Sequence, residues 1–494
     1  MNLATTPFLR AGSDSLSLQQ LLAEAETFPS INAAPHERIS ILRLLIAISH
    51  DALGNLSASD LRKLRPSDLA TATSDYLAQP EIESAFELLG EGPRFLQVRT
   101  DKIKTTPCSK IFLHLATGNN PTLLDHAGGT DRAFSPENLA TALLTYQNFS
   151  PLIGRGFKGR GPCVSGNALH SFRVGSNLAE TILENLLDSE ATRKYVEGFG
   201  TPIWRMPVTA ASLANPETDP AARNATLSYL GRLVPLSRAL WISDDRTQFV
   251  LDNGLPYPGI EKAQEPTTTV RWKQKKGSPP EPFLLSAKVD RAIWRDLPAI
   301  LRGGEKGGEA TPVLRPRQGE QSTDLSLWCG GLVTDFKAKV IDTVSAEFSG
   351  PLALPKELNH EFGVAAYQAA LVAAETWEIS IGKALYAYCD AMKLDTKKRL
   401  PDLKRTAREQ FWDRMQAHLP QLLDLVRDPP EASSAEPYTD SPWHRTCKRV
   451  AGQVYADCCP SDTPRQAMAH GRGLRALWPK NPAKKTPSKK TVAA

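Results

Sequence analysis

The residue pattern changes near Pro355, and this change limits the folds that the chain can adopt. Residues 1 to about 350 mix short apolar runs with Pro- and Gly-rich turns, which is typical of a domain that holds both helices and strands. Beyond that point the pattern is helical, with Asp- and Pro-rich breaks between the periodic segments. We expect four helices, at about 358–393, 401–428, 439–456 and 463–477.

This spacing predicts an α+β fold in which a large mixed N-terminal globular domain, residues 1–350, is followed by a C-terminal four-helix bundle, residues 351–480. Pro420 should kink or interrupt the second helix of the bundle. Residues 481–494 are rich in lysine and poor in apolar residues, so we expect a disordered basic tail. Such a tail either keeps the protein in solution or touches nucleic acid weakly.

Several local patterns place elements within the first 350 residues. Ile41, Leu44, Leu45 and Ile48 have helical spacing, which predicts a helix with one buried face. Ser135 followed by Pro136 is a typical helix start. The run from Val270 to Gly277 suggests a hairpin whose basic residues, Arg271 to Lys276, form a solvated face.

Composition narrows the classes of function. The formal net charge is only +5 over 494 residues, so any nucleic-acid site must come from local clusters of positive charge. Seven cysteines without repeated C-x-x-C spacing indicate reduced, structural thiols. No secretory signal and no run of 18 apolar residues is visible, which leads us to expect a cytoplasmic protein without a membrane partner.

The stretch from Leu152 to Pro162 combines four glycines with three cations, Arg155, Lys158 and Arg160. Glycine lets the backbone approach a ligand closely, and the cations suit a polyanion. No Gly-Lys-Ser/Thr closes the stretch, so it is not a nucleotide P-loop. On these residues alone, a polyanion cradle and a flexible surface loop both remain open.

Two further segments have the composition of binding loops, and no segment of the chain has the composition of a catalytic centre. Thr117 to His126 is rich in Asn, and Trp328 to Lys339 contains a glycine turn at Gly330-Gly331. No cluster of His, Cys or carboxylates has metal-ligand spacing, so we predict no metal and no cofactor. Cys163 and His170, with Asp125, would form a hydrolase site only by coincidence of folding.

Four short motifs accompany these segments: Asn2-Leu3, Pro7-Phe-Leu-Arg10, Pro93-Arg-Phe-Leu-Gln-Val98 and Pro202-Ile-Trp204. In their order along the chain, the segments and motifs resemble the large subunit of the type I-E CRISPR surveillance complex Cascade, the CasA family. The resemblance covers most of the chain. It implies a non-catalytic subunit of a crRNA-guided ribonucleoprotein that recognises the protospacer-adjacent motif (PAM) of double-stranded DNA from the minor groove. It also implies duplex opening, R-loop formation, contacts with the crRNA and other Cascade subunits, and recruitment of a helicase-nuclease.

The resemblance also implies which residues would bind. The PAM-reading glycine loop falls on Gly154, Arg155, Gly156, Phe157 and Lys158, and the wedge that splits the duplex falls on Thr334, Asp335, Phe336 and Lys337. The family often has Gln where this chain has Phe336. The nearest cation to the family's basic finger is Arg246, and the loop that contacts the guide and the other subunits falls on Asn119, Asn120, Leu123 and Leu124.

Plainer interpretations stand beside these assignments. Phe336, Leu123 and Leu124 are also compatible with an ordinary core, and Arg246 with a solvated surface charge. Two other functions remain as alternatives: a cysteine-type hydrolase that uses Cys163 and His170, and a purely structural ribonucleoprotein scaffold.

Overall fold

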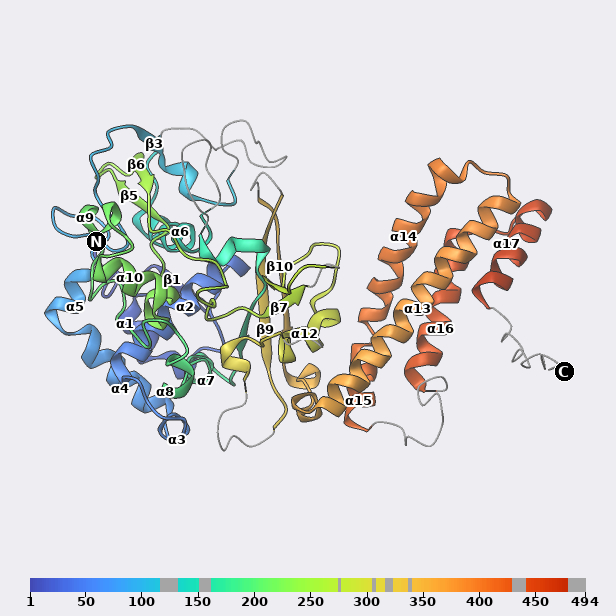
Figure 1. Ribbon diagram of the computed structural model, residues 1–494, viewed down its shortest axis with the longest axis horizontal. Coiled ribbons are helices and arrows are strands. Elements are labelled where there is room, and N and C mark those ends of the chain that lie inside the picture. Colours follow the sequence, from blue (N-terminus) through green and yellow to red (C-terminus); the bar gives the residue numbers. More distant parts are fainter. Residues whose placement is uncertain are drawn as a thin grey trace, which may run out of the picture. The chain divides into compact units, whose positions relative to one another are not determined.

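The computed structural model describes residues 1–115, 132–150, 161–273, 277–303, 308–315, 323–335, 340–428 and 441–478 (Figure 1). The chain divides into two compact units, Met1–Leu354 and Pro355–Ala494. The first unit mixes helices with short antiparallel strands, and the helices and strands seen together agree with the mixed fold expected from the sequence.

The first unit is built largely from short helices. Its α-helices are α1 (Leu18–Ala23), α2 (Pro35–Leu53), α3 (Ala58–Leu61), α4 (Pro66–Leu77), α5 (Pro80–Ala85), α6 (Pro136–Phe149), α7 (Leu178–Glu184), α8 (Ser189–Thr192), α9 (Ala210–Ala214), α10 (Pro220–Leu227), α11 (Tyr229–Leu233) and α12 (Leu297–Arg302). Its 3-10 helices are η1 (Ala25–Thr27), η2 (Cys108–Ile111), η3 (Pro162–Asn167), η4 (Ile293–Asp296), η5 (Pro312–Leu314) and η6 (Gly350–Leu352).

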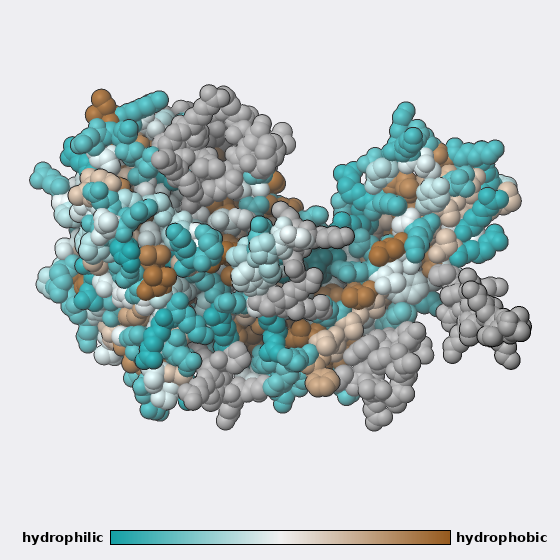
Figure 2. Space-filling model, viewed as in Figure 1, coloured by the Kyte–Doolittle hydropathy of each residue, from teal (hydrophilic) through white to brown (hydrophobic). Residues whose placement is uncertain are grey.

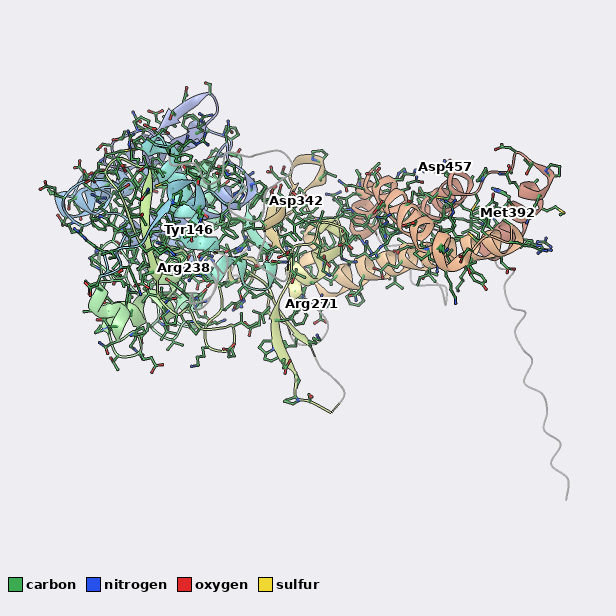
Figure 3. The ribbon with its side chains drawn as sticks, turned by 90° about the horizontal axis from the view of Figure 1, so that it is seen from above. Tyr146, Arg238, Arg271, Asp342, Met392 and Asp457 are labelled. Carbon is green, nitrogen blue, oxygen red and sulfur yellow. The ribbon has the colours of Figure 1, made fainter. Side chains whose placement is uncertain are left out.

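In the described part of this unit, the strands form two three-stranded sheets and two hairpins, all antiparallel. The strands are β1 (Leu9–Ala11), β2 (Asp14–Leu16), β3 (Thr105–Pro107), β4 (His170–Arg173), β5 (Arg238–Ile242), β6 (Gln248–Asn253), β7 (Val270–Lys273), β8 (Glu281–Leu284), β9 (Leu327–Thr334) and β10 (Val340–Phe348). The sheets have the orders β10-β9-β4 and β3-β6-β5, while β1 pairs with β2 and β7 with β8. In Figure 3, Arg271 marks the β7–β8 hairpin, which extends from the body of the unit.

Helix α2 lies in the middle of the first unit and is buried on all sides from Ile39 to His50, not on one face as its periodicity suggested. It packs against α4, α6, α7, α11 and β9. Even Ser40 and Arg43, on its polar side, are fully buried. Ser40 donates to the carbonyl of His36 in the preceding turn, and Arg43 finds its partners on segments far away in the sequence.

Those partners form a buried ion network. Arg43 Nη2 lies 2.9 Å from Glu265 Oε2, and Arg232 pairs with the other oxygen of the same carboxylate. Burial alone would raise the pKa of Glu265, but the guanidinium groups of Arg232 and Arg43 hold it below its ordinary value. Arg43 also donates to Thr267, whose hydroxyl contacts Nδ1 of His170 at 2.7 Å. The network therefore joins α2 to strand β4.

The second unit is helical and opens with the 3-10 helix η7 (Lys356–Asn359). Its α-helices are α13 (Glu361–Ala391), α14 (Thr396–Gln416), α15 (Leu419–Arg427), α16 (Pro442–Cys458) and α17 (Pro464–Leu477). The long helix α13 packs against each of the other four. Small buried residues on it, such as Ala366 and Ala370, allow close approach, and Trp443 Nε1 donates to the Ala370 carbonyl at 2.9 Å.

The second of the four expected helices is divided in two. Helix α14 ends at Gln416, and α15 begins at Leu419 with Pro420 in its first turn. The first-turn amides of a helix have no carbonyl partner within it, so proline starts the new helix without the loss of a hydrogen bond. The interruption that Pro420 predicts is therefore present.

The surface is mainly polar. Figure 2 shows hydrophilic residues over most of the visible face of each unit, with small apolar patches between them. Within the described ranges, none of the helices has both the length and the apolar character needed to cross a bilayer. Six of the seven cysteines are buried, Cys458 is half-buried, and all seven are free thiols.

Candidate nucleic-acid interface

The residues that flank the glycine segment, 151–160, lie side by side. Gly154, Arg155, Gly156, Phe157 and Lys158 fall outside the described residues, but Ser150 and Gly161, which flank 151–160, are described. The Gly161 N–H donates to the Ser150 carbonyl at 2.8 Å. A Cβ at Gly161 would lie 2.5 Å from the Asn148 carbonyl oxygen, so only glycine permits this approach. The chain thus leaves α6 and returns to it at one point.

From Gly161 the chain runs through η3 into strand β4. Cys163 and Val164 anchor η3 in the core. Its last two residues, Gly166 and Asn167, have φ values of 62° and 54°, in the left-handed region. Asn is among the few residues other than glycine that adopt this conformation readily. The turn brings the chain onto β9, with which β4 pairs from His170↔Gly330 to Arg173↔Leu327.

The expected wedge falls at the end of the β9–β10 hairpin. The last paired residues are Thr334 and Val340, so residues 335–339 connect the two strands. Thr334 is buried and Asp335 half-buried, while Phe336 and Lys337 lie outside the described residues. Every residue of β9 is buried, which gives the connection a base fixed in the core.

A set of hydrogen bonds joins the bases of these two segments. Asn167 Nδ2 donates to the Thr334 carbonyl at 2.9 Å, and Asn167 Oδ1 accepts from the Thr334 N–H at 3.1 Å and from its hydroxyl at 2.7 Å. We call this contact the Asn167–Thr334 clamp. It holds the chain that follows the glycine segment against the residue where the hairpin connection begins.

The structure corrects the expectation of a turn at Gly330-Gly331. Both residues lie inside strand β9, paired with β10 on one side, and Gly330 also with β4 on the other. A Cβ at Gly331 would lie 2.7 Å from the Ala287 Cβ and 2.9 Å from the Ala168 carbonyl oxygen. Glycine is present here because the segment next to Asn167 presses against the strand, and not because the chain reverses.

Arg246 belongs to a different hairpin, between β5 and β6. Its φ of 62° places it in the left-handed region, and its N–H donates to the Ser243 carbonyl at 2.9 Å. Hydrogen bonds from Ser243 and Thr247, with a contribution from the Arg246 charge, lower the pKa of the neighbouring Asp245. The side chain of Arg246 is half-buried in the same turn.

The expected guide-contacting residues Asn119, Asn120, Leu123 and Leu124 lie outside the described residues, but the flanks of their segment are close together. The rings of Phe112 and Phe134 stack with centroids 4.5 Å apart. The Phe134 N–H also donates to the Arg246 carbonyl at 3.3 Å. The base of this segment and the Arg246 turn are therefore neighbours.

The structure thus brings together the described flanks of the glycine segment and of the hairpin connection, and places the flank of the guide-contacting segment apart from them. Helix α6 connects the flank of the guide-contacting segment, at Ser135, to the base of the glycine segment, at Ser150. Its 14 residues span about 21 Å at the usual rise of about 1.5 Å per residue. Strand β4, which follows the glycine segment, and strand β9, which precedes the hairpin connection, share one sheet, whereas the flank of the guide-contacting segment at Ser135 lies a helix length away.

Cys163 and His170 do not form a nucleophile and base. Nε2 of His170 contacts the carbonyl oxygen of Cys163 at 3.0 Å, while the thiol of Cys163 lies 3.4 Å from Asn148 Oδ1. Burial raises the pKa of the Cys163 thiol to about 12 and lowers that of His170 to about 4. Both groups are neutral near pH 7 and closed to solvent, an arrangement that suits a structural pair and opposes thiolate catalysis.

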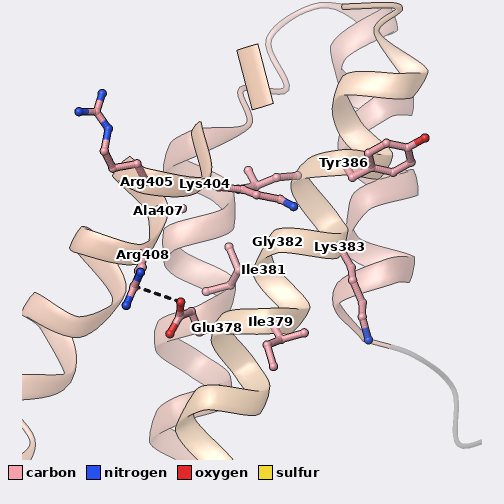
Figure 4. Close-up of a pocket in the computed structure, with 11 residues that line it drawn as sticks. Glu378, Ile379, Ile381, Gly382, Lys383, Tyr386, Lys404, Arg405, Ala407 and Arg408 are labelled. Carbon is pink, nitrogen blue, oxygen red and sulfur yellow. Dashed lines mark ion pairs between the residues drawn. The ribbon is translucent and has the colours of Figure 1, made fainter. Parts of the chain in front are cut away.

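The helical unit contains a groove of about 720 Å³ between α13 and α14 (Figure 4). Buried Ile381, Leu385 and Ala407 form part of its lining, and Ile379 and Tyr386 are exposed beside them. Its charged residues are mostly basic, namely Lys383, Lys404, Arg405 and Arg408, and the carboxylate of Glu378 is paired with Arg408 at 3.3 Å. We call this feature the α13–α14 groove.

Sequence reasoning missed the clamp and the buried ion network. The Gly166-Asn167 pair is a recognisable signal for left-handed backbone, but nothing local shows that its amide would meet Thr334. Arg43 interrupts an apolar helical stripe, and such a residue is a candidate for a buried partner. Its partner, 222 positions further on, has no sequence signal of its own.

Solved structures with this fold cover nearly the whole chain. Thermus thermophilus CasA (Cse1) matches with a TM-score of 0.72 and 20% identity, over 97% of this chain and 99% of that one. Thermobifida fusca Cse1 gives a TM-score of 0.73 at 20% identity, over 97% and 96%. A chain of a structure described as a CRISPR RNA-guided surveillance complex gives 0.71 at 20% identity, over 97% and 99%. The fold is therefore that of the CasA (Cse1) proteins.

The sequence leads to the same family. A curated relative, the CRISPR-associated protein CasA/Cse1 of Thermus thermophilus, is 29% identical over 371 residues, which is 68% of this chain and 67% of the relative. The model of the family CRISPR-associated protein Cse1 matches residues 2–454. The chain belongs to this family, and the resemblance to CasA is confirmed.

Proposed function

We propose that the chain is the non-catalytic large subunit of a crRNA-guided type I-E Cascade complex. In this proposal it recognises the PAM of double-stranded DNA from the minor groove and opens the duplex to start the R-loop. Membership of the Cse1 family supports the assignment, as does the likeness in fold to a chain of an RNA-guided surveillance complex. Recruitment of the helicase-nuclease belongs to the proposal through the family resemblance.

The observation that carries the proposal is the common base of the glycine segment and the hairpin connection. Strands β4 and β9 pair directly, and the Asn167–Thr334 clamp joins the chain just before β4 to the end of β9. A reader of a short DNA motif that also splits the neighbouring base pair needs its two contacts at a fixed spacing. In this role, Gly154 to Lys158 face the minor groove, where glycine permits close approach and the cations hold phosphates.

Phe336 acts as the wedge in this proposal. An aromatic ring stacks on an unpaired base with a free energy of about 1–3 kcal/mol. The ring replaces the amide that the family often has here, so the wedge acts by stacking and not by a side-chain hydrogen bond. In the proposal, Lys337 and Lys158 contact the backbone phosphates.

The α13–α14 groove supports a second contact, with the displaced strand or a neighbouring subunit. Its cations Lys383 and Lys404 attract phosphates, as does Arg405, which is also paired with Asp402 at 3.0 Å, and Tyr386 offers a ring on which a base can stack. This contact extends the proposal to the helical unit, which we expect to contact neighbouring small subunits and the displaced strand.

The proposal is tested by binding of the reconstituted complex to duplexes with and without candidate PAMs. Gly156→Pro and Lys158→Ala should each weaken binding to the PAM-containing duplex on the order of tenfold, and so reduce the ratio between the two duplexes. Phe336→Ala should mainly slow the opening of the bound duplex. Matched controls are the exposed Lys194→Ala and Phe362→Ala, which should change neither binding nor opening.

Other outcomes separate the alternatives. If all three variants assemble, and bind and open both duplexes as the unaltered complex does, the site assignment is wrong and a structural scaffold explains the chain better. A turnover that Cys163→Ala abolishes would instead revive the hydrolase alternative.

A further inference from the structure

A polar cavity of about 780 Å³ lies in the first unit and takes no part in the proposed reading of DNA. It is lined by β1, the first turns of α2 and α6, and the residues around Phe112 and Arg132. None of its described lining residues belongs to β4, β9 or β10. Its volume falls within the range of about 300–1,000 Å³ that is usual for small-molecule sites.

Aromatic rings form the inner part of the lining. Phe8, Phe112 and Phe134 line the cavity and are only 7%, 8% and 9% exposed. Phe112 and Phe134 stack on each other, which fixes the orientation of both rings. Ile41 and Leu9, also buried, complete an apolar wall suited to a flat aromatic ligand.

Positive charge and hydrogen-bond donors surround this wall. Arg10 and Arg132 are exposed lining residues, and neither is ion-paired with a carboxylate in the described part of the chain. The Arg132 guanidinium lies 4.8 Å from the centre of the Phe134 ring. Asn138 and His114 add further polar groups.

The carboxylate in the lining is already engaged. Oε2 of Glu37 accepts the Ala34 N–H at 3.1 Å, at the start of α2. The cavity therefore offers more free positive than negative charge, which favours an anionic ligand. Arg binds phosphate through paired N–H groups, and a phosphate offers enough oxygen atoms for both arginines to bind it at once.

We infer that this cavity binds a nucleotide, with the base against the aromatic wall and the phosphate on Arg10 and Arg132. A free mononucleotide and a nucleotide within single-stranded RNA present the same chemistry. The inference does not depend on PAM reading, because the cavity shares no residue with the glycine segment or the hairpin.

Calorimetric titration of the full chain tests the inference, with AMP, adenosine, inorganic phosphate and a short single-stranded RNA as probes. AMP or the RNA should bind, and adenosine and phosphate should bind at least about tenfold more weakly, because each offers half of the contacts. Binding of the RNA alone assigns the cavity to an RNA strand, and binding of AMP as well assigns it to free nucleotides.

Three variants locate the binding. Arg10→Ala and Arg132→Ala should each weaken it on the order of tenfold, whereas the exposed Arg193→Ala, outside the cavity, should not. Asn138→Asp adds a negative charge to the lining. Asn138 lies in the first turn of α6, where a carboxylate is favourable to the helix, so this variant should weaken binding without loss of stability.

The inference is overturned if neither AMP nor RNA binds at millimolar concentration. It is also overturned if phosphate binds as tightly as AMP, or if the Arg10 and Arg132 variants bind as the unaltered chain does. The same variants should leave PAM discrimination unchanged, so failure here and failure of the proposed function are distinguishable.

Discussion

Asn167 and Thr334 are 167 positions apart in the sequence and are joined by three hydrogen bonds. One residue follows the glycine segment, and the other precedes the hairpin connection. Because the amide of Asn167 engages both backbone groups of Thr334, neither segment can shift at its base without breaking the contact. The clamp therefore fixes the spacing between the bases of the two segments that carry the proposed DNA contacts.

Replacing Asn167 tests the clamp. Asn167→Ala removes all three hydrogen bonds and places alanine at a φ of 54°, whereas Asn167→Gly removes the bonds but accepts this φ. We expect both variants to lower the free energy of unfolding by about 1–3 kcal/mol, with alanine the more severe. Urea unfolding measures this loss.

The two Asn167 variants also test the proposed function. Both variants should reduce the ratio of binding between duplexes with and without a PAM in the reconstituted complex. Asn167→Gly retaining the full ratio would show that the clamp stabilises the fold but does not position the contacts.

The close approach at strand β9 gives a second prediction. In Gly331→Ala the new methyl group would meet the Ala287 side chain and the Ala168 carbonyl, so we expect a loss of about 1–3 kcal/mol in the free energy of unfolding. Gly92→Ala is the matched control, since a Cβ there has no neighbour within 4 Å. Thermal unfolding measures the stability of both variants, and equal stability would contradict the packing described.

The buried ion network gives a third prediction. Glu265→Gln leaves Arg43 and Arg232 buried without a negative partner, so we expect a loss of about 3–5 kcal/mol in the free energy of unfolding. Glu184→Gln, which changes the exposed partner of Arg173, should alter it by less than about 1 kcal/mol. Similar urea midpoints for the two variants would show that the network contributes little.

Buried imidazoles predict how stability depends on pH. Burial, with the charges of His114 and Arg43 respectively, lowers the pKa of both His36 and His170 to about 4. In the unfolded chain these groups take up protons below about pH 6.5. The unfolded state therefore binds more protons than the folded state between about pH 6.5 and 4. The free energy of unfolding should be highest above this window and fall by about 3 kcal/mol per imidazole as the pH is lowered through it.

A histidine variant isolates this effect. His36→Gln removes one of the two groups, so the dependence of the unfolding free energy on pH should become shallower between about pH 6.5 and 4. His360→Gln, at an exposed position, is the control. A slope that His36→Gln leaves unchanged would assign the acid sensitivity to other groups.

Local signals in the sequence were sufficient where local contacts decide the structure. The helix expected at Ser135-Pro136 is α6, in which the Ser135 hydroxyl accepts the Asn138 N–H at 3.3 Å. Pro420 begins a new helix, and the run after Val270 forms a strand of the β7–β8 hairpin. Each of these features depends on residues only a few positions apart.

Expectations from the sequence were wrong where contacts between distant residues decide the structure. The Gly330-Gly331 pair has the composition of a turn, but Ala168 and Ala287 make glycine necessary within a strand. The periodicity of α2 indicates one buried face, but Glu265 supplies the partner that allows Arg43 to be buried as well. The order of the binding segments was readable from the sequence through the family resemblance, whereas the clamp that joins two of them was not.

The central claim is that the glycine segment and the hairpin connection act together to read a PAM and open the adjacent base pair. It is tested most directly by the rate of opening of that pair, followed by 2-aminopurine fluorescence in the reconstituted complex. For Phe336→Ala we predict that PAM-dependent association is retained while opening slows on the order of tenfold, as expected for the loss of one stacking contact. Opening at the unaltered rate, with PAM dependence intact, would contradict the account.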